Sequence, residues 1–150
     1  ISGSFRFSQG IMWQNYLKAF SLAPIKQFFF NSVLIAIGGT TLNLVVTAMA
    51  AYVVARFKYR LNGLFKLMFA TVLFIPCAAL LQPLYTTINA LGLYDQKMAL
   101  VLVYAGLGLA TSFYIIMSYY LTIPTVLEEA AYIDGAGFLR TFTTIILPLS

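Results

Sequence analysis

Acidic side chains are rare in this sequence, and most of them lie together. Of the four in the 150-residue chain, three fall within seven positions, at Glu128, Glu129 and Asp134. Clustered carboxylates can bind a metal ion, transfer protons or contact a basic partner. The chain has no histidine, a single cysteine and no Walker-type loop for ATP. We therefore expect no metal, no cofactor and no enzymatic activity, and we interpret the acidic residues as contacts for a partner.

The composition indicates a protein embedded in a membrane. Hydrophobic residues make up 61% of the chain and charged residues 9%, whereas about a quarter of a soluble domain is charged. Three charge-free runs, at 31–55, 67–88 and 98–121, each exceed the roughly 20 residues that a spanning helix needs. Buried helices of a soluble protein rarely occur as three such runs. The sequence predicts an all-α, polytopic membrane helical bundle, with another span starting near residue 145.

Basic residues indicate which loops are cytoplasmic. The segment 56–66 carries four Lys or Arg residues, and the loop 89–97 carries one. The positive-inside rule then places 56–66 and the acidic stretch 122–144 in the cytoplasm, and 1–30 and 89–97 outside. The net charge of +5 therefore reflects membrane topology rather than binding of nucleic acid. We expect a multi-pass protein of the inner or plasma membrane, in contact with lipid. Since the chain starts at isoleucine and stops inside an apolar run, we expect it to be the middle of a longer protein.

A short amphipathic helix is predicted before the first span. Its apolar residues at helical spacing are Met12, Trp13, Tyr16, Leu17 and Phe20. Such a helix either lies at the outer membrane surface or simply orients the chain as it enters the span.

Two patterns inside the predicted spans concern how the helices pack. Small and weakly polar residues recur every fourth position, at Gly39, Asn43, Thr47, Ala51 and Ala55. A stripe of this kind lets a second helix approach closely. In the second span, Pro76 and Pro83 each remove a backbone donor and are expected to bend the helix. In the third span, packing is also the expected role of Gly106, Gly108 and Ala110.

Polar side chains in the spans are few. Asn43, Gln82 and Tyr85 are candidates to face a transport pathway, although packing explains each of them as well. No carboxylate lies in any predicted span. This disfavours an ion-coupled carrier, which usually places Asp or Glu near the middle of the membrane. If the protein pumps a solute, another component must supply the energy.

The acidic stretch predicts a helix, a tight turn and a second helix. Thr125 and Glu128 have the spacing of a capping box. Glu128 and Glu129 fall in the first turn, where carboxylates interact favourably with the helix dipole. Gly135 stands where the helix would end and where a left-handed residue is common, and Ala136 continues the turn.

The faces of this predicted helix favour a docking surface over a merely solvated helix. A solvated, capped helix explains the acidic residues. It does not explain the small side chains of Ala130 and Ala131, which favour helix and would leave a flat face. It does not explain the glycines either. A surface that binds a cytoplasmic protein explains all of these features.

The spacing of this stretch carries a specific resemblance. It reads Glu129-Ala130-Ala131, three residues, Gly135, nine residues, Ile145, one residue and Leu147-Pro148. This is similar to the EAA loop of the permease subunits of binding-protein-dependent ABC importers, of the MetI-like type. The extended form of the loop, Ile133-Asp134-Gly135-Ala136, is also present. Other matches resemble the carbohydrate branch, and they are Asn31-Ser32, Ala50-Ala51-Tyr52, Ala55-Arg56-Phe57, Pro76, Pro83-Leu84-Tyr85, Leu91-Gly92-Leu93 and Ile123-Pro124.

The resemblance implies a division of labour among several proteins. The EAA loop would form a coupling helix that docks in a cleft of a cytoplasmic ABC ATPase subunit. Glu129 would pair with a basic residue of that ATPase, Gly135 would make the turn, and Glu128 and Asp134 would support or flank the contact. The other partners implied are a second, similar permease in a heterodimer and an extracytoplasmic solute-binding protein. The solute would be a sugar or a related compound.

Three alternatives stay open on the sequence. The first is the same kind of importer for a peptide, phosphate or amino acid. The second is an ion-coupled secondary carrier, which would depend on an ion gradient rather than on ATP. The third is a membrane scaffold that transports nothing and shows no substrate-dependent ATPase activity with its partners.

Overall fold

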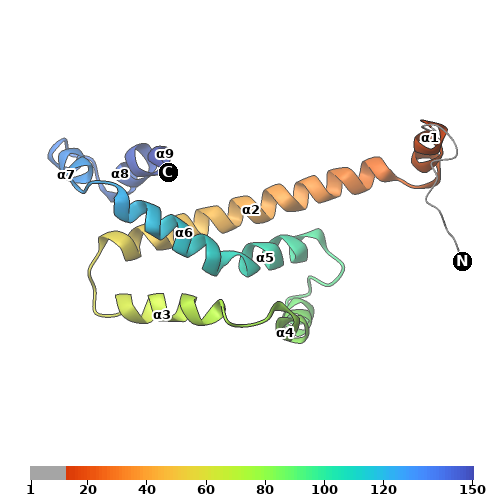
Figure 1. Cartoon of the computed structure of the whole chain (residues 1–150), viewed down its shortest axis with the longest axis horizontal. Helices are drawn as coiled ribbons and strands as arrows, with labels where there is room; N and C mark the ends of the chain where they lie inside the picture. Colours follow the sequence, from red (N-terminus) through yellow and green to blue (C-terminus); the bar gives the residue numbers. More distant parts are fainter. Residues whose placement is uncertain (1–12) are drawn as a thin grey trace, which may run out of the picture. The chain divides into compact units, whose positions relative to one another are not determined.

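The computed structural model describes residues 13–150 and is all-helical over that range, as predicted (Figure 1). The helices are α1 (Trp13–Leu22), α2 (Ile25–Arg56), α3 (Asn62–Val72), α4 (Cys77–Ala90), α5 (Lys97–Leu107), α6 (Leu109–Thr122), α7 (Val126–Ile133), α8 (Phe138–Thr141), a π-helical turn (Phe142–Ile146) and α9 (Leu147–Leu149). The chain divides into two compact units, one ending at Leu34 and the other running from Ile35 to Ser150.

The first unit contains the predicted amphipathic helix. α1 forms over Trp13–Leu22 and has no buried residue. Trp13 and Tyr16 lie one turn apart, and their ring centroids are 5.8 Å from each other. Met12, which we included in this helix, lies outside the described residues. The helix is confirmed from Trp13 onward, and its position at a membrane surface stays a prediction.

α2 is the one continuous helix in the described chain that is long and apolar enough to cross a membrane. It has 32 residues, which at 1.5 Å per residue is about 48 Å. No proline interrupts it, and its charged residues, Lys26 and Arg56, lie in its first and last turns. A hydrocarbon core about 30 Å thick fits within this length.

The second and third predicted spans are each divided by a bend. α3 and α4 meet at 103°, and α5 and α6 meet at 49°. Pro76 stands at the N-cap of α4, where a missing backbone donor costs little. Pro83 lies inside α4, where the hydroxyl of Thr87 donates to its carbonyl oxygen at 2.8 Å. If each bent pair counts as one segment, the described chain has up to three segments that are long and apolar enough to cross a membrane.

The hydrophobic core of the second unit lies where α2, α6 and the segment after α7 meet. Its buried members are Ala48, Ala51, Tyr52, Val54, Phe113, Met117, Tyr120, Ile123, Phe142 and Ile146. α3 packs against the outside of α6, where the rings of Phe69 and Phe113 stack with centroids 4.1 Å apart. The hydroxyl of Tyr114 donates to the carbonyl of Lys66 at 2.5 Å on the same side.

The stripe on α2 packs as predicted. Gly39, Asn43, Thr47 and Ala51 are all buried. A Cβ added at Gly39 would lie 3.2 Å from Cβ of Tyr104 and 3.4 Å from the carbonyl oxygen of Val101. α2 and α5 therefore approach closely at a position where only glycine fits without adjustment. In Figure 1, α2 runs alongside α5 and α6.

The glycines of the third predicted span differ from one another. Gly108 lies at the bend, and a Cβ there would be 3.1 Å from the amide nitrogen of Asn43. Ala110 is buried. A Cβ at Gly106 would meet nothing within 4 Å, so the packing role that we expected of Gly106 is not seen among the described residues.

Candidate functional site

The acidic helix α7 starts differently from the prediction. Thr125 has helical backbone angles (φ −63°, ψ −24°), and its side chain makes no capping bond. The backbone N–H groups of Glu128 and Glu129 instead donate to the carbonyl of Thr125, at 2.9 and 3.0 Å. The predicted capping box is therefore wrong. The physical reason is that the Glu128 carboxylate turns away from the helix start and bonds elsewhere.

Glu128 forms a buried ion pair with Arg56, the last residue of α2. Nε of Arg56 lies 2.7 Å from Oε1 of Glu128, and the two side chains are only 7% and 9% exposed. Nη2 of the same guanidinium donates to the carbonyl of Ile123 at 2.8 Å. Arg56 therefore bonds both to a residue of α7, Glu128, and to a residue just before it, Ile123. Sequence reasoning missed this role because the partners are 72 positions apart.

α7 ends at the predicted left-handed glycine. Gly135 has φ +79°. Its N–H donates to the carbonyl of Tyr132 at 3.1 Å, and the N–H of Ala136 donates to the carbonyl of Ala131 at 2.9 Å. These two bonds form a Schellman motif, which satisfies carbonyls that the helix end would leave unpaired. A Cβ at Gly135 would meet nothing within 4 Å, so the backbone conformation, rather than lack of space, requires glycine here.

The exposed surface of α7 is apolar with one carboxylate near its middle. Val126, Glu129, Ala130 and Ile133 share one face by their helical spacing, and all four are exposed. Ile133 is 87% exposed. Val126 and Ile133 are not among the residues predicted for the docking surface, although their helical spacing around Glu129 is the signal that could have identified them.

The remaining predicted residues of this segment fall into two groups. Asp134 and Gly135 are exposed at the end of the helix, and Ala136 is half-buried. Ala131 is 5% exposed and faces the rest of the protein. The expectation that Ala130 and Ala131 together form a flat outer face is therefore wrong for Ala131. The reason is that α7 packs on the rest of the protein through the side that carries Glu128 and Ala131, which leaves Ala130 on the outer side.

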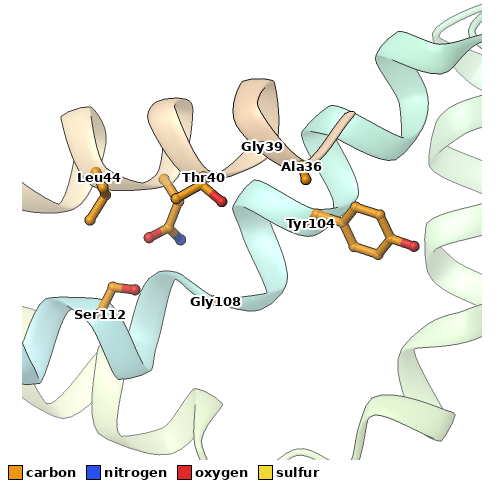
Figure 2. Close-up of a pocket in the computed structure, with 8 residues that line it drawn as sticks. Ala36, Gly39, Thr40, Leu44, Tyr104, Gly108 and Ser112 are labelled. Atoms are coloured by element: carbon orange, nitrogen blue, oxygen red, sulfur yellow. The ribbon is translucent and has the colours of Figure 1, made fainter. Parts of the chain in front are cut away.

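A pocket lies between α2 and the bent pair α5 and α6. Its volume is about 420 Å³, and it is lined by Ala36, Gly39, Thr40, Asn43, Leu44, Tyr104, Gly108 and Ser112 (Figure 2). The Asn43 amide donates to the carbonyl of Ala105 at 2.7 Å, beside the bend. Neighbouring polar side chains stabilise broken membrane helices in this way. Thr40 and Ser112 add hydroxyls to the lining. The ring of Tyr104 points away from these side chains (Figure 2).

Gln82 and Tyr85 do not join this pocket. Both lie exposed on α4 and are absent from the pocket lining. Tyr85 contacts Tyr94 edge to face, with ring centroids 6.0 Å apart. Of the three candidate pathway residues, Asn43 lines the pocket between α2 and the α5–α6 pair, and Gln82 and Tyr85 do not.

Sequence comparisons place this chain among membrane transport proteins. No protein-family model matches it. It is 34% identical to a sulfoquinovosyl glycerol transport system permease protein of Agrobacterium fabrum, over 90% of this chain and 47% of that protein. It is 33% identical to a trehalose/maltose transport system permease protein of Thermococcus litoralis, over 91% and 50%. It is 30% identical to a diacetylchitobiose uptake system permease protein of Streptomyces coelicolor, over 100% and 50%. The chain spans about half the length of these relatives.

Proposed function

We propose that this chain, which belongs to the permease proteins of ABC transporters, forms part of the membrane pathway of an ATP-driven importer. The observation that carries the proposal is the surface of α7, a short helix with an exposed carboxylate, an apolar stripe and a left-handed glycine turn. The residues of this segment match the EAA spacing at every marked position. The whole protein would be a multi-pass protein of the inner or plasma membrane, and it would catalyse no reaction itself.

α7 is suited to dock on a cytoplasmic ATPase subunit. Val126 and Ile133 flank Glu129 on the exposed face and are 65% and 87% exposed. Apolar residues of this size at a protein surface favour burial against a partner. A carboxylate among them would pair with a basic residue of the partner, because a charge pair fixes the register of an interface. Asp134 and Gly135 would lie at the edge of the contact.

α2 and the pocket beside it are suited to contact the transported solute. Asn43, Thr40 and Ser112 supply an amide and two hydroxyls in a pocket of about 420 Å³. Side chains of these types are common polar partners of small-molecule ligands in binding pockets. The relatives are named for transport of sulfoquinovosyl glycerol, uptake of diacetylchitobiose, and transport of trehalose and maltose. We propose a sugar or a related solute as the substrate class.

The proposal implies further partners. A single copy of this chain leaves large apolar side chains exposed on α2, α4 and α6, among them Ile37, Leu81 and Ile115. Lipid and a second permease would cover these surfaces. An extracytoplasmic binding protein would deliver the solute. Two ATPase subunits would supply the energy, because the predicted spans hold no carboxylate that could couple transport to an ion gradient.

Affinity purification of the full-length protein from its own membrane tests this function. The expected result is that ATPase, second permease and binding protein co-purify and are identified by mass spectrometry. Glu129→Lys should lower the co-purified ATPase at least about tenfold, because a like charge would replace the proposed ion pair. Lys58→Glu, a charge reversal at an exposed loop residue, is the control. Purification of the protein alone, with both variants equal to wild type, would contradict the proposal.

A further inference from the structure

Arg56 connects three elements at the end of α2. Its guanidinium contacts the carboxylate of Glu128 on α7 and the carbonyl of Ile123 at the end of α6, at 2.7 and 2.8 Å. A guanidinium holds its donors in a rigid plane, so two bonds from one group fix both direction and distance. The start of α7 is therefore held to α2 in a single arrangement.

An aromatic cluster supports the same joint. Tyr52 lies one turn before Arg56 on the same face of α2. Its ring stacks on Phe142 with centroids 4.9 Å apart, and it also contacts Phe138 at 5.3 Å and Tyr120 at 5.9 Å. α6, which precedes α7, and α8 with the π-helical turn, which follow it, therefore pack on α2 one helical turn from the Arg56–Glu128 ion pair.

α2 leads from this joint to the pocket without a break. Asn43 and Arg56 are 13 residues apart in one uninterrupted helix, which corresponds to about 20 Å. An uninterrupted helix is a rigid element of the kind that carries coupling between distant sites, whereas the α5–α6 pair on the opposite side of the pocket is bent by 49°. A displacement of α7 would reach the pocket through α2.

We propose that Arg56 and Glu128 are positioning residues that transmit movement of the acidic helix to the pocket. The ion pair fixes α7 to the end of α2, so that a shift of α7 on its partner moves α2 at Gly39, Thr40 and Asn43. This inference rests on the proposed function, since it takes the ATPase as the source of the movement. It assigns Glu128 to the internal joint and leaves Glu129 as the outward contact.

The test measures whether ATP changes how accessible the pocket lining is to a thiol reagent. In the full-length complex, Cys77→Ser removes the one cysteine of residues 1–150, and any cysteine elsewhere in the complex is also replaced by serine. Thr40→Cys then introduces a thiol in the pocket lining. The rate of maleimide labelling is then compared with and without ATP. In this background, Glu128→Gln should retain wild-type amounts of co-purified ATPase, while the ATP-dependent change in labelling falls about tenfold. The matched control Arg60→Gln, which removes an exposed charge from the neighbouring loop, should leave the change intact.

A second variant separates positioning from stability. Arg56→Met combined with Glu128→Leu fills a similar volume and leaves no buried charge unpaired, so it should reach the membrane at wild-type levels. It cannot bond the carbonyl of Ile123, and the ATP-dependent change should be lost in it as well. A wild-type change in this double variant or in Glu128→Gln would overturn the inference alone. A wild-type complex without ATPase, or without any change on adding ATP, would overturn the proposed function and the inference with it.

Discussion

The turn after the acidic helix allows a prediction whose size follows from one backbone angle. Gly135 has φ +79° and no atom within 4 Å of an added Cβ. Substitution there costs conformational energy only, about 1–2 kcal/mol for an ordinary L-residue. This corresponds to roughly a 5- to 30-fold loss of the turn conformation. The cost should be smallest for Gly135→Asn, larger for Gly135→Ala, and largest for Gly135→Val, because β-branched residues resist this region.

A neighbouring glycine provides the matched control. Gly137 also has no atom within 4 Å of an added Cβ, but its angles are φ −77° and ψ 169°, which any residue adopts. The assay is the amount of ATPase that co-purifies with the full-length protein, together with ATP hydrolysis by the complex. Both should fall in the order Asn, Ala, Val at position 135, and Gly137→Val should match wild type. Equal behaviour of Gly135→Val and Gly137→Val would refute the role of the turn.

Three further changes probe the charge, the pocket and the core. Glu129→Gln should lower the co-purified ATPase less than Glu129→Lys does, because it removes the charge without adding repulsion; equal losses would contradict an ion pair. Asn43→Ala should lower the free energy of unfolding of the detergent-solubilised protein by about 1–3 kcal/mol, because the Ala105 carbonyl loses its buried donor. The measurement is the melting temperature, and an unchanged value would count against that bond. Tyr52→Ala should cost about 3–5 kcal/mol in the same assay, since it empties the centre of the aromatic cluster. Asn43→Ala is the smaller change of the two, and the reverse order would contradict the packing described.

Local features of the chain were predictable because they depend on neighbouring residues. The helical class follows from the long charge-free runs. The buried stripe on α2 follows from the small residues at every fourth position, namely Gly39, Asn43, Thr47 and Ala51. The turn at Gly135 follows from the one residue type that adopts a left-handed angle freely. The division of the second predicted span was partly visible in Pro76, although a proline predicts a bend and not an angle of 103°.

Features that depend on distant contacts were not predictable. Glu128 looked like a capping residue from its spacing to Thr125, but the guanidinium of Arg56 offers it a stronger, buried partner. The same packing of α7 against the core buries Ala131 and leaves Ala130 outside. Which of two adjacent carboxylates faces inward depends on how α7 is rotated on α2, and no local pattern reports that rotation.

The most direct test of the account is whether the exposed face of α7 touches the ATPase. In the full-length protein with Cys77→Ser, Ala130→Cys places a thiol beside Glu129 on that face. Tyr94→Cys, at an exposed turn predicted to lie outside the cell, is the control. With a short thiol-reactive cross-linker, Ala130→Cys should become covalently joined to the ATPase subunit, and Tyr94→Cys should not. Absence of a cross-link from Ala130→Cys, in a complex that retains its ATPase, would contradict docking through this helix.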